Sequence, residues 1–544
     1  MNATESLNIV LKGLLHPGDH VITTGMEHNS VLRPLYELEE KGVSVTIVAC
    51  EKNGTISCEK IQQAIGKNTK AIVCTHASNV TGDGNDIAQI GTLCEKYNLY
   101  FILDASQTAG AAGIDMEQDH ISAICFTGHK GLFGPQGTGG IALADGVCVK
   151  PLLSGGSGVH SFERKHPMEL PAALEAGTLN GHGIAGLHAA LDWIKKTGIA
   201  AIHEKEMALA EQFQRGIETI PGIHLYGGEK RVAAIVSCNL ADLDSAYVSD
   251  CLAEDYGIAT RAGVHCAPLM HTHFGTEKQG MVRFSFSCFN TTEEVEKAVR
   301  AMQDIAMENR GKVTAYVGAG GKTSSIRKRA ETLRAEGKRV LILTTTKMMV
   351  PQEQEIFAAY EQTGQESVIL DTGAVSKECR AAEKQLKERV QSVLDTYGCC
   401  VAGSLIPGTE KFGMLPEKLM EDLLYLADEI LIEADGSAHM PVKAPAEHEP
   451  VLFPYMDEVV IVMGAHAIGK PLQEVCHRAD YAKKILKCDA DKIVTATDIR
   501  VLAEQGYAIP IQKQFPWMKI SKVTGKDIKL CLTAEKKDKE RDKQ

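Results

Sequence analysis

One lysine in the first half of the chain occupies a position that suits covalent chemistry. The segment 126–140, FTGHKGLFGPQGTGG, places Lys130 directly after an apolar run and among glycines. A lysine held at the end of a buried strand and partly desolvated can form a Schiff base with an aldehyde cofactor. The alternative interpretation is a solvated lysine before a turn.

An aspartate ends an earlier apolar run, in the segment LDASQTAG (103–110). A buried Asp104 carboxylate needs a cationic partner, because an unpaired buried charge is costly. The protonated ring nitrogen of pyridoxal phosphate (PLP) is one such partner, and capping of the following turn is the alternative. Asp104 and Gln107, with Lys130 after a further strand, form the pattern expected of a PLP site.

A glycine-rich loop in the second half, VGAGGKTSS, suggests phosphate binding, through Gly318, Gly320, Gly321, Lys322 and Thr323. Backbone N–H groups of such a loop and of the following helix bind phosphate, and the lysine adds a positive charge. A tight turn with a surface lysine is the alternative.

Two carboxylates, Glu433 and Asp435, end a later apolar run of the second half. Carboxylates at that position could hold Mg²⁺ beside bound phosphates. For Asp435, a helix N-cap role is the alternative. The expected ligand of this half is therefore ATP with Mg²⁺.

The elements that must position these residues alternate between strands and helices. Apolar β-branched runs at 43–50, 70–78, 100–106 and 123–129 enclose helical patterns such as 87–98. This alternation predicts an α/β fold with a mainly parallel sheet covered on both faces. From about residue 185, long helical patterns followed by short strands predict a smaller α+β subdomain.

A polar stretch, MENRGK (307–312), separates this region from a new strand, glycine loop, helix and strand. Such an opening normally begins a nucleotide-binding domain. We therefore expect a first domain over 1–306, with a large subdomain over residues 1–185 and a small subdomain over residues 186–306, and a second domain over 311–515. Residues 516–544 are expected to be a disordered or altered tail, because the end of the chain is a run of mixed charge.

Composition excludes several classes of protein. The 544-residue chain has a formal net charge of −12, which argues against non-specific binding to nucleic acid or anionic membranes. No apolar run approaches the ~18 residues of a membrane span, and the N-terminus lacks the features of a signal peptide. The 16 cysteines include no C-x-x-C pair, which fits buried thiols in a reducing cytoplasm.

Residues 1–306 resemble the class V aminotransferase fold, in particular its NifS-like group of cysteine desulfurases and selenocysteine lyases. Besides the lysine and aspartate segments, the motifs that carry the resemblance are MEHNS (26–30), HASNVTGD (76–83), EAGTLN (175–180), RAGVHCAPLM (261–270) and VRFSFSCFNT (282–291). The resemblance implies a PLP-dependent transferase of fold type I that forms a homodimer. The family carries a further segment ahead of the first residue here, so the fold is expected to be N-terminally truncated.

The resemblance assigns a role to each matching residue. It implies cofactor contacts by Thr4, His28, Asn79, Asp104, Gln107, Thr127, His129 and Lys130, and by Thr178 of the neighbouring subunit. His28 would stack on the cofactor ring and take part in catalysis with Lys130. Cys266 would carry the persulfide, and Arg283, Arg261 and Asn79 would bind the substrate.

The implied reaction converts L-cysteine, or selenocysteine, into alanine and a chalcogen atom bound to Cys266. The acceptor of that atom is not identified by the sequence. Another class V reaction, by an aminotransferase or an epimerase, is one alternative. A non-catalytic nucleotide-binding scaffold is a second.

Residues 311–510 resemble the YqeC family, described as selenium cofactor biosynthesis or selenium-dependent hydroxylase accessory proteins. GAGGKTS, TTTKM, EADGSA, KAPAEHEPV and VMGAHAIGKPL carry the resemblance. The spacing of the glycine loop also resembles that of Mur-ligase-type ATPases, so a P-loop-like α/β domain is expected. A chalcogen-mobilising enzyme joined to a selenium-cofactor accessory domain is the function that the pairing implies.

Overall fold

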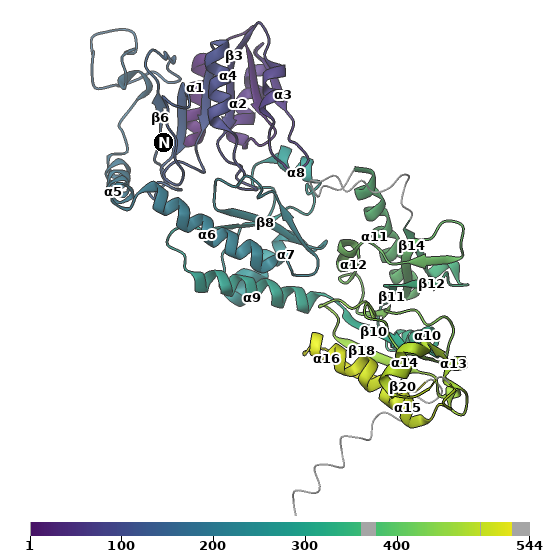
Figure 1. Cartoon of the computed structure of the whole chain (residues 1–544). Helices are drawn as coiled ribbons and strands as arrows, with labels where there is room; N and C mark the ends of the chain where they lie inside the picture. The colour runs from purple at the N-terminus through teal and green to yellow at the C-terminus, as the bar shows by residue number, and fades with distance from the viewer. Residues whose placement is uncertain (1, 361–376, 490, 525–544) are drawn as a thin grey trace, which may run out of the picture. The chain divides into compact units, whose positions relative to one another are not determined.

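The computed structural model of the chain describes residues 2–360, 377–489 and 491–524. It divides into two compact units, Met1–Ile305 and Ala306–Gln544, and each is described by itself (Figure 1). Both units are built from helices and strands, as the mixed α/β prediction requires.

The first unit is built on a six-stranded sheet whose strands lie in the order β2-β1-β3-β4-β5-β6. The strands are β1 (His20–Thr24), β2 (Ser44–Val48), β3 (Thr69–Thr75), β4 (Tyr100–Asp104), β5 (Ala123–Thr127) and β6 (Gly139–Leu143). Neighbours pair in parallel except for β6, which runs antiparallel to β5. The carboxyl ends of five parallel strands therefore meet at one edge of the sheet.

Helices cover both faces of this sheet because its strand residues alternate between two cores. On one face, α1 (Ala3–Leu14) and α2 (Asn29–Glu39) pack on residues such as Val73. On the other, α3 (Cys58–Ala64) and α4 (Ile87–Tyr97) pack on residues such as Ile72. Because helices cover both faces of the sheet, residues on both sides of each strand are apolar, and the strands are continuous apolar runs in the sequence.

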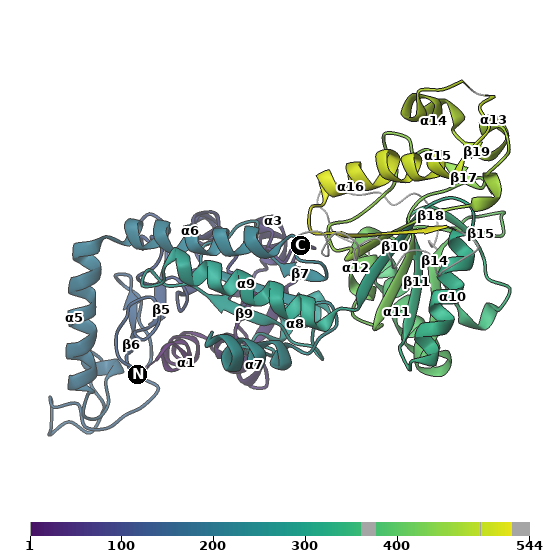
Figure 2. The same ribbon diagram turned by 90° about the horizontal axis from the view of Figure 1, so that it is seen from below.

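The remainder of the first unit is an α+β region, as the change of pattern near residue 185 predicts. Its antiparallel sheet contains β7 (Ile223–Tyr226), β8 (Ile235–Leu240) and β9 (Val282–Ser285). Its helices are α5 (Gly181–Thr197), α6 (Ile199–Ile217), α7 (Ser245–Tyr256), α8 (Pro268–Phe274) and α9 (Thr292–Asn309), preceded by the 3₁₀ turn η1 (Ala172–Leu174). Figure 2 shows this region from below.

The second unit is built on a nine-stranded sheet in the order β12-β15-β14-β11-β16-β10-β18-β20, with β13 paired to β14. Its strands are β10 (Lys312–Gly318), β11 (Val340–Thr344), β12 (Lys347–Met349), β13 (Phe357–Tyr360), β14 (Cys399–Leu405), β15 (Lys411–Gly413), β16 (Glu429–Glu433), β18 (Glu458–Met463) and β20 (Lys519–Thr524). Two short strands, β17 (Val442–Lys443) and β19 (Cys476–His477), form a separate pair. The glycine loop begins at Gly318, the last residue of β10, while Glu433 ends β16 and Asp435 lies just beyond it. Because β10 and β16 are adjacent and parallel, they bring the loop and the two carboxylates together.

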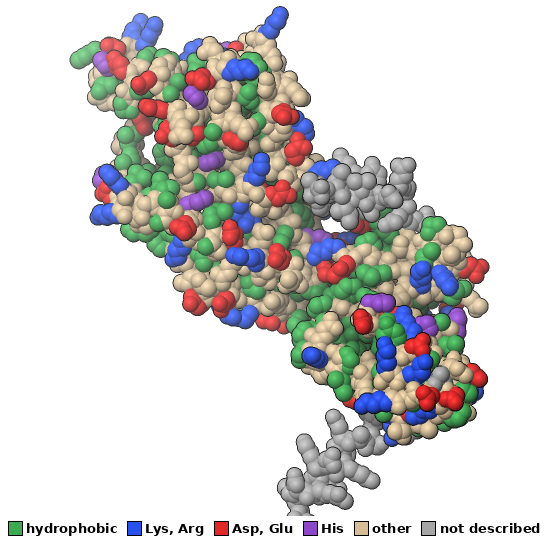
Figure 3. Space-filling view, in the orientation of Figure 1, with side chains coloured by type: hydrophobic (Ala, Val, Ile, Leu, Met, Phe, Trp, Pro, Cys, Tyr) green, Lys and Arg blue, Asp and Glu red, His purple; other side chains and the backbone are tan. Residues whose placement is uncertain are grey.

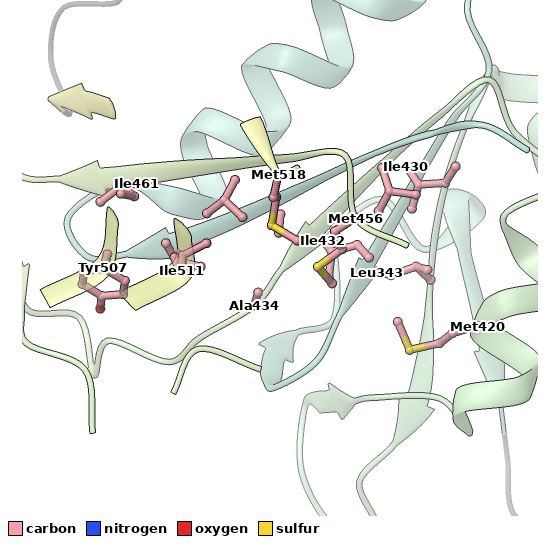
Figure 4. Packing of buried hydrophobic residues seen from close by; sticks show 14 of the residues in the cluster. Leu343, Met420, Ile430, Ile432, Ala434, Met456, Ile461, Tyr507, Ile511 and Met518 are labelled. Atoms are coloured by element: carbon pink, nitrogen blue, oxygen red, sulfur yellow. The ribbon is translucent and has the colours of Figure 1, made fainter. Parts of the chain in front are cut away.

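Helices also pack on both faces of the second sheet. One face contacts α10 (Lys322–Ala335), through Ile326, Ala330 and Leu333. The other contacts α11 (Lys377–Tyr397), α12 (Glu417–Leu423) and the C-terminal helical region, which contains α14 (Ala479–Leu486), α15 (Ala496–Val501), a π-helix (Leu502–Ala508) and α16 (Ile509–Gln514). Figure 4 shows Tyr507 and Ile511 in this core, close to Ile461 of β18.

The end of the second unit differs from the expected boundary at residue 515. Strand β20 pairs in parallel with β18 from Lys519 to Thr524, and Met518 just before it is buried in the core. The sequence does not predict this strand, because Ile520 and Val523 are the only apolar residues in KISKVT and two polar residues separate them. A short polar strand of this kind is typical of a sheet edge. The rest of the expected tail, 525–544, lies outside the described residues.

Lys and Arg side chains are interspersed with Asp and Glu side chains on the face shown in Figure 3. In the described residues, no helix combines the length and the apolar character that a membrane span requires. The cysteines described there are free thiols.

Candidate active site

A cavity of about 130 Å³ lies at the carboxyl edge of the first sheet. It is lined by Asn2, Ala3, Thr4, His28, Ser30, Thr75, Asn79, Asp104, Ser106, Gln107, Thr127, His129 and Lys130. Eight of the residues singled out from the sequence are in this set, and they come from segments that follow β1, β3, β4 and β5 or lie in α1. The parallel sheet thus brings them to one place.

Asp104 lines this cavity and is only 2% exposed. Its Oδ1 accepts a hydrogen bond from the backbone N–H of Ser106 at 2.9 Å and another from the Ser106 hydroxyl. Its backbone carbonyl accepts from the His76 N–H. The aspartate therefore has a fixed orientation, and these neutral donors leave its negative charge unneutralised.

Lys130 follows β5 and lines the same cavity. Lys130 is exposed as a whole residue, but the protein around its amine excludes enough water to lower its pKa from the usual value of 10.5, while the Asp104 charge opposes this shift. Arg283 and Arg261 lower the pKa further because they are also positive. The result is an amine that loses its proton more readily than a surface lysine does, which is what a Schiff-base lysine requires.

The imidazole of His28 has two roles in the structure. It caps α2, because its Nδ1 accepts a hydrogen bond from the Ser30 backbone N–H at 3.0 Å. It also lines the cavity, and burial lowers its pKa. The helix cap, which is the ordinary interpretation of such a histidine, is therefore compatible with a position next to a cofactor ring.

Hydroxyl groups lie along the cavity wall. The hydroxyls of Thr4 and Ser30 are 2.7 Å apart, and Thr127 Oγ1 is 2.8 Å from His129 Nδ1. Hydroxyl and imidazole groups of this kind are suitable donors to a phosphate. Gln107 completes the lining near Asp104.

Two arginines and a thiol approach the cavity from the α+β region. Arg283 donates a hydrogen bond from Nη1 to the backbone carbonyl of Asn79 at 2.9 Å. Burial lowers the pKa of Arg283 to about 10, and the neighbouring Arg261 adds to the effect. Cys266 Sγ lies 3.7 Å from Arg261 Nη2. Cations in these positions can bind a substrate carboxylate and stabilise a thiolate.

Thr178 is the one residue predicted to contact the cofactor that this cavity does not include. It is exposed and lies between η1 and α5. A contact of Thr178 with the cofactor would have to be made in a second copy of the chain.

The glycine loop of the second unit connects β10 to α10, which begins at Lys322. Gly318, Gly320 and Gly321 have φ angles of 94°, 77° and 129°, values that residues with a side chain rarely adopt. At Gly320 a Cβ atom would lie 2.4 Å from the Pro441 carbonyl oxygen. Glycine is therefore required for the turn.

Side chains around this loop form a buried set of charges. Lys322 Nζ donates to the Gly318 carbonyl at 2.7 Å and is 3.2 Å from Asp435 Oδ1. The Thr323 hydroxyl donates to Glu433 Oε2 at 2.8 Å. Burial raises the pKa of Glu433, and the Lys322 charge opposes that shift.

Asp435 has different surroundings from Glu433. It is fully buried, and its Oδ2 accepts hydrogen bonds from the Gly318 N–H at 3.0 Å and the Tyr507 hydroxyl at 2.9 Å. The buried Lys443 ammonium lies 3.4 Å away. Asp435 thus connects the glycine loop to the π-helix that carries Tyr507.

Several residues near the two sites were not found from the sequence. Glu27 is fully buried, accepts a hydrogen bond from the Thr24 hydroxyl and lies 3.0 Å from the Thr75 N–H. Burial raises its pKa to about 8. Its position beside His28 in MEHNS is the signal that could have identified it. Tyr507 has no local signal, because its partner Asp435 is 72 residues away in the sequence. Lys443 does have a local signal, because it opens the KAPAEHEPV segment and its partners Asp435 and Glu449 lie close by in the sequence.

Two family models match the chain. Residues 1–298 match the aminotransferase class-V model, and residues 314–480 match the model of YqeC protein. The two matches cover the segments that carry the two resemblances seen in the sequence.

The curated proteins similar to this chain include cysteine desulfurases. A probable cysteine desulfurase of Methanothermobacter thermautotrophicus is 33% identical over 311 residues, which are 56% of this chain and 78% of the relative. One from Pyrococcus abyssi is 31% identical, over 56% of this chain and 77% of the relative. Among solved structures, the apo cysteine desulfurase of Thermococcus onnurineus NA1 is 29% identical with a TM-score of 0.53, covering 56% of this chain and 78% of that one.

We predict that Glu27→Gln changes how stability depends on pH. Folded Glu27 keeps its proton up to about pH 8, whereas the unfolded side chain loses it near 4.5. Since the folded state then binds more protons, its free energy of unfolding falls as pH rises through this window, by about 1.4 kcal/mol per pH unit. Glutamine cannot ionise, so the variant lacks this contribution.

Urea unfolding of the full chain at several pH values between 5 and about 8 measures the effect. Other ionisable groups contribute equally to both proteins, so the difference between the two curves isolates Glu27. Parallel curves for wild type and variant would show that Glu27 ionises normally.

Proposed function

Because the chain belongs to the class V aminotransferase family, we propose that its first unit is a PLP-dependent cysteine desulfurase. The reaction moves one sulfur atom from L-cysteine to the Cys266 thiol, which leaves alanine and a Cys266 persulfide. The observation that carries the proposal is the single cavity that Lys130 and Asp104 share, with Cys266 and Arg283 close enough to alter the pKa of Lys130 or of one another.

The chemistry of the cavity fits PLP. A buried carboxylate, Asp104, is a suitable partner for the protonated ring nitrogen. The lowered pKa of Lys130 suits an amine that bonds to an aldehyde carbon. His28 presents an aromatic ring, and Thr4 and Thr127 present hydroxyls for the phosphate. Gln107 and His129 would complete the cofactor contacts.

When bound, PLP supplies an electron sink for the negative charge left at the substrate Cα. Residues of this chain orient the substrate and transfer its proton. Arg283 orients the substrate carboxylate, and Arg261 and Asn79 support it. Lys130 then moves the Cα proton as a general acid and base, for which its lowered pKa is suited.

The sulfur step belongs to Cys266. Arg261 lies 3.7 Å from its sulfur and favours the thiolate, which attacks the sulfur of the substrate. The bond between the substrate sulfur and its carbon breaks, and a bond forms between that sulfur and the sulfur of Cys266. A proton added to the carbon that has lost the sulfur then completes alanine. Selenocysteine would follow the same course with selenium in place of sulfur, and the ratio of kcat/KM for the two amino acids tests which is preferred.

We predict that Cys266→Ala lowers alanine release from L-cysteine by about 10³-fold or more, since it removes the attacking nucleophile. The cofactor should still bind, so the visible absorbance gained on adding PLP remains. Lys130→Ala should lose that absorbance as well as turnover. Cys251→Ala, a partly buried thiol on α7, is the matched control and should leave turnover unchanged.

Two results would favour the alternatives. Undiminished turnover in Cys266→Ala would indicate another class V reaction, such as that of an aminotransferase or an epimerase. A wild-type chain that gains no absorbance with PLP and only binds ATP would indicate a nucleotide-binding scaffold.

We also propose that two copies of the chain form a homodimer in which Thr178 acts across the interface. Thr178 is exposed and does not line the cavity of its own chain. Exposed apolar residues lie beside it, with Leu179 at 51% and Ile184 at 50%. Apolar side chains gathered in this way often mark a protein interface.

Mixing two inactive variants tests this arrangement. If Thr178 acts across the interface, Lys130→Ala and Thr178→Ala chains together form one site with both residues intact, and activity returns. The expected recovery is about a quarter of wild type, because random pairing yields half mixed dimers with one intact site each. If mass spectrometry shows that subunits exchange but activity does not return, Thr178 acts in the site of its own chain or has no role in a site.

For the second unit we propose binding of ATP with Mg²⁺. Support comes from the glycine loop, from Lys322 at the start of α10, and from the hydrogen bond between Thr323 and Glu433. A hydroxyl beside a carboxylate at a phosphate loop is the usual ligand pair for Mg²⁺. Asp435, the other predicted metal ligand, is enclosed by the Gly318 N–H and Tyr507, so we assign it to holding the loop.

We predict that Thr323→Ala and Glu433→Gln each weaken Mg²⁺-dependent ATP binding by about 10- to 100-fold. Calorimetric titration with ATP, with Mg²⁺ and then with EDTA, measures the loss. Thr332→Ala, an exposed threonine further along α10, is the matched control. Equal affinities for Thr323→Ala and wild type would contradict the metal assignment.

The match to YqeC protein over residues 314–480 supports a link to selenium cofactor biosynthesis. We propose that nucleotide bound by the second unit serves the transfer of the chalcogen to an acceptor that has not been identified. Chalcogen delivery that responds neither to ATP nor to Lys322→Ala would contradict this coupling.

A further inference from the structure

The loop that carries Cys266 has an unfavourable backbone conformation. His265 and Cys266 are consecutive, and their φ angles are 52° and 58°. Residues with a Cβ atom avoid this left-handed region, and such a conformation persists only where surrounding contacts hold it. The contacts that hold these two residues therefore control where the thiol lies.

Two backbone contacts hold the loop from the side of the cavity. The carbonyl of His265 accepts a hydrogen bond from the Asn79 side-chain amide at 2.7 Å. The carbonyl of Cys266 accepts one from the Asn29 N–H at 2.8 Å. Both donors follow strands of the first sheet, β3 and β1, so the sheet edge fixes one side of the loop.

A chain of hydrogen bonds holds the loop from the other side. The imidazole of His265 is 2% exposed, and its Nε2 lies 2.9 Å from the Arg261 carbonyl oxygen. A carbonyl oxygen only accepts, so Nε2 carries the proton and Nδ1 does not. His265 Nδ1 lies 3.4 Å from Nε2 of His271, which must therefore be the donor.

The same reasoning extends to the next partner. Since His271 donates from Nε2 and is neutral, its Nδ1 accepts, and the Thr276 hydroxyl at 2.8 Å is the donor. Burial lowers the pKa of both histidines, that of His265 to about 4, which keeps the two rings neutral near pH 7. Each imidazole thus has one tautomer, and every hydrogen bond runs from Thr276 toward Arg261.

The position of His271 fixes one end of this series of hydrogen bonds. His271 is fully buried and lies in α8, which begins at Pro268, two residues after the cysteine. The series of hydrogen bonds therefore connects Arg261, at the start of the cysteine loop, to α8, the helix at the end of the loop. Arg261 is also the residue whose guanidinium lies 3.7 Å from the thiol.

We propose that His265 and His271 are positioning residues for sulfur transfer, which hold the left-handed turn at Cys266 so that its sulfur faces Arg261 at the cavity. The proposal rests on the proposed desulfurase function. The two imidazoles contact neither substrate nor cofactor and exchange no proton during the reaction. Their effect is confined to the location of the nucleophile.

The first test removes the hydrogen bond between the rings but keeps an aromatic side chain. His271→Phe should lower kcat for L-cysteine by about tenfold to 10²-fold, as expected for a small displacement of a reacting atom. KM and the visible absorbance of bound PLP should stay unchanged. His271→Gln should recover part of the loss, because its amide can donate to His265 and accept from Thr276.

The second test separates the conformation of the backbone from the presence of the ring. Glycine adopts the left-handed conformation freely and alanine does not. His265→Ala should therefore be more impaired than His265→Gly. Equal loss in the two variants would show that the turn is not held under strain, and would overturn the proposal.

Alkylation gives a readout that does not depend on turnover. The rate at which iodoacetamide labels the Cys266 peptide, followed by mass spectrometry of the full chain, should change in His271→Phe and return toward wild type in His271→Gln. Wild-type kcat and labelling rate in His271→Phe would overturn the proposal, and inactive Cys266→Ala would still support the desulfurase function. A wild-type chain that releases no alanine would overturn that function, and the labelling rates would still decide the role of the histidines.

Discussion

The first unit depends on one buried negative charge. Asp104 is 2% exposed and is held by the Ser106 N–H and hydroxyl, which orient the carboxylate without cancelling its charge. A buried charge of this kind must have a cation nearby. Lys130 lies in the same cavity, and a protonated ring nitrogen of PLP would be a closer match. The need to compensate Asp104 thus explains both the position of the lysine and the choice of cofactor.

Much of this site could be predicted because most of its residues end or follow a strand, Thr4 of α1 being an exception. Parallel strands end at one edge of the sheet, so the motifs after β1, β3, β4 and β5 had to meet there. The residue pattern alone indicated Lys130, Asp104 and Gln107. The other predicted residues of the cavity came only from the resemblance to the class V family. The glycine loop and Glu433 of the second unit could be predicted for the same reason, since β10 and β16 are adjacent and parallel.

The remainder could not be predicted, because it depends on contacts between distant segments. Asn79 and His265 are 186 residues apart, and no pattern in either segment indicates that they are bonded. The raised pKa of Glu27 results from complete burial, which the sequence MEHNS does not reveal. Tyr507 reaches Asp435 from a π-helix, which ordinary helical periodicity does not predict. In both sites, therefore, the motifs could be predicted from the sequence, but the long-range contacts that hold their residues in place could not.

We propose that the amine of Lys130 bonds to the aldehyde of PLP in the cavity that it shares with Asp104. Reduction with borohydride after PLP is added to the full chain, followed by peptide mapping, tests it directly. We expect a pyridoxyl group on Lys130, and its loss in Asp104→Ala because the ring nitrogen then lacks its partner. A label on other lysines alone, or no label, would show that Lys130 does not bond to PLP.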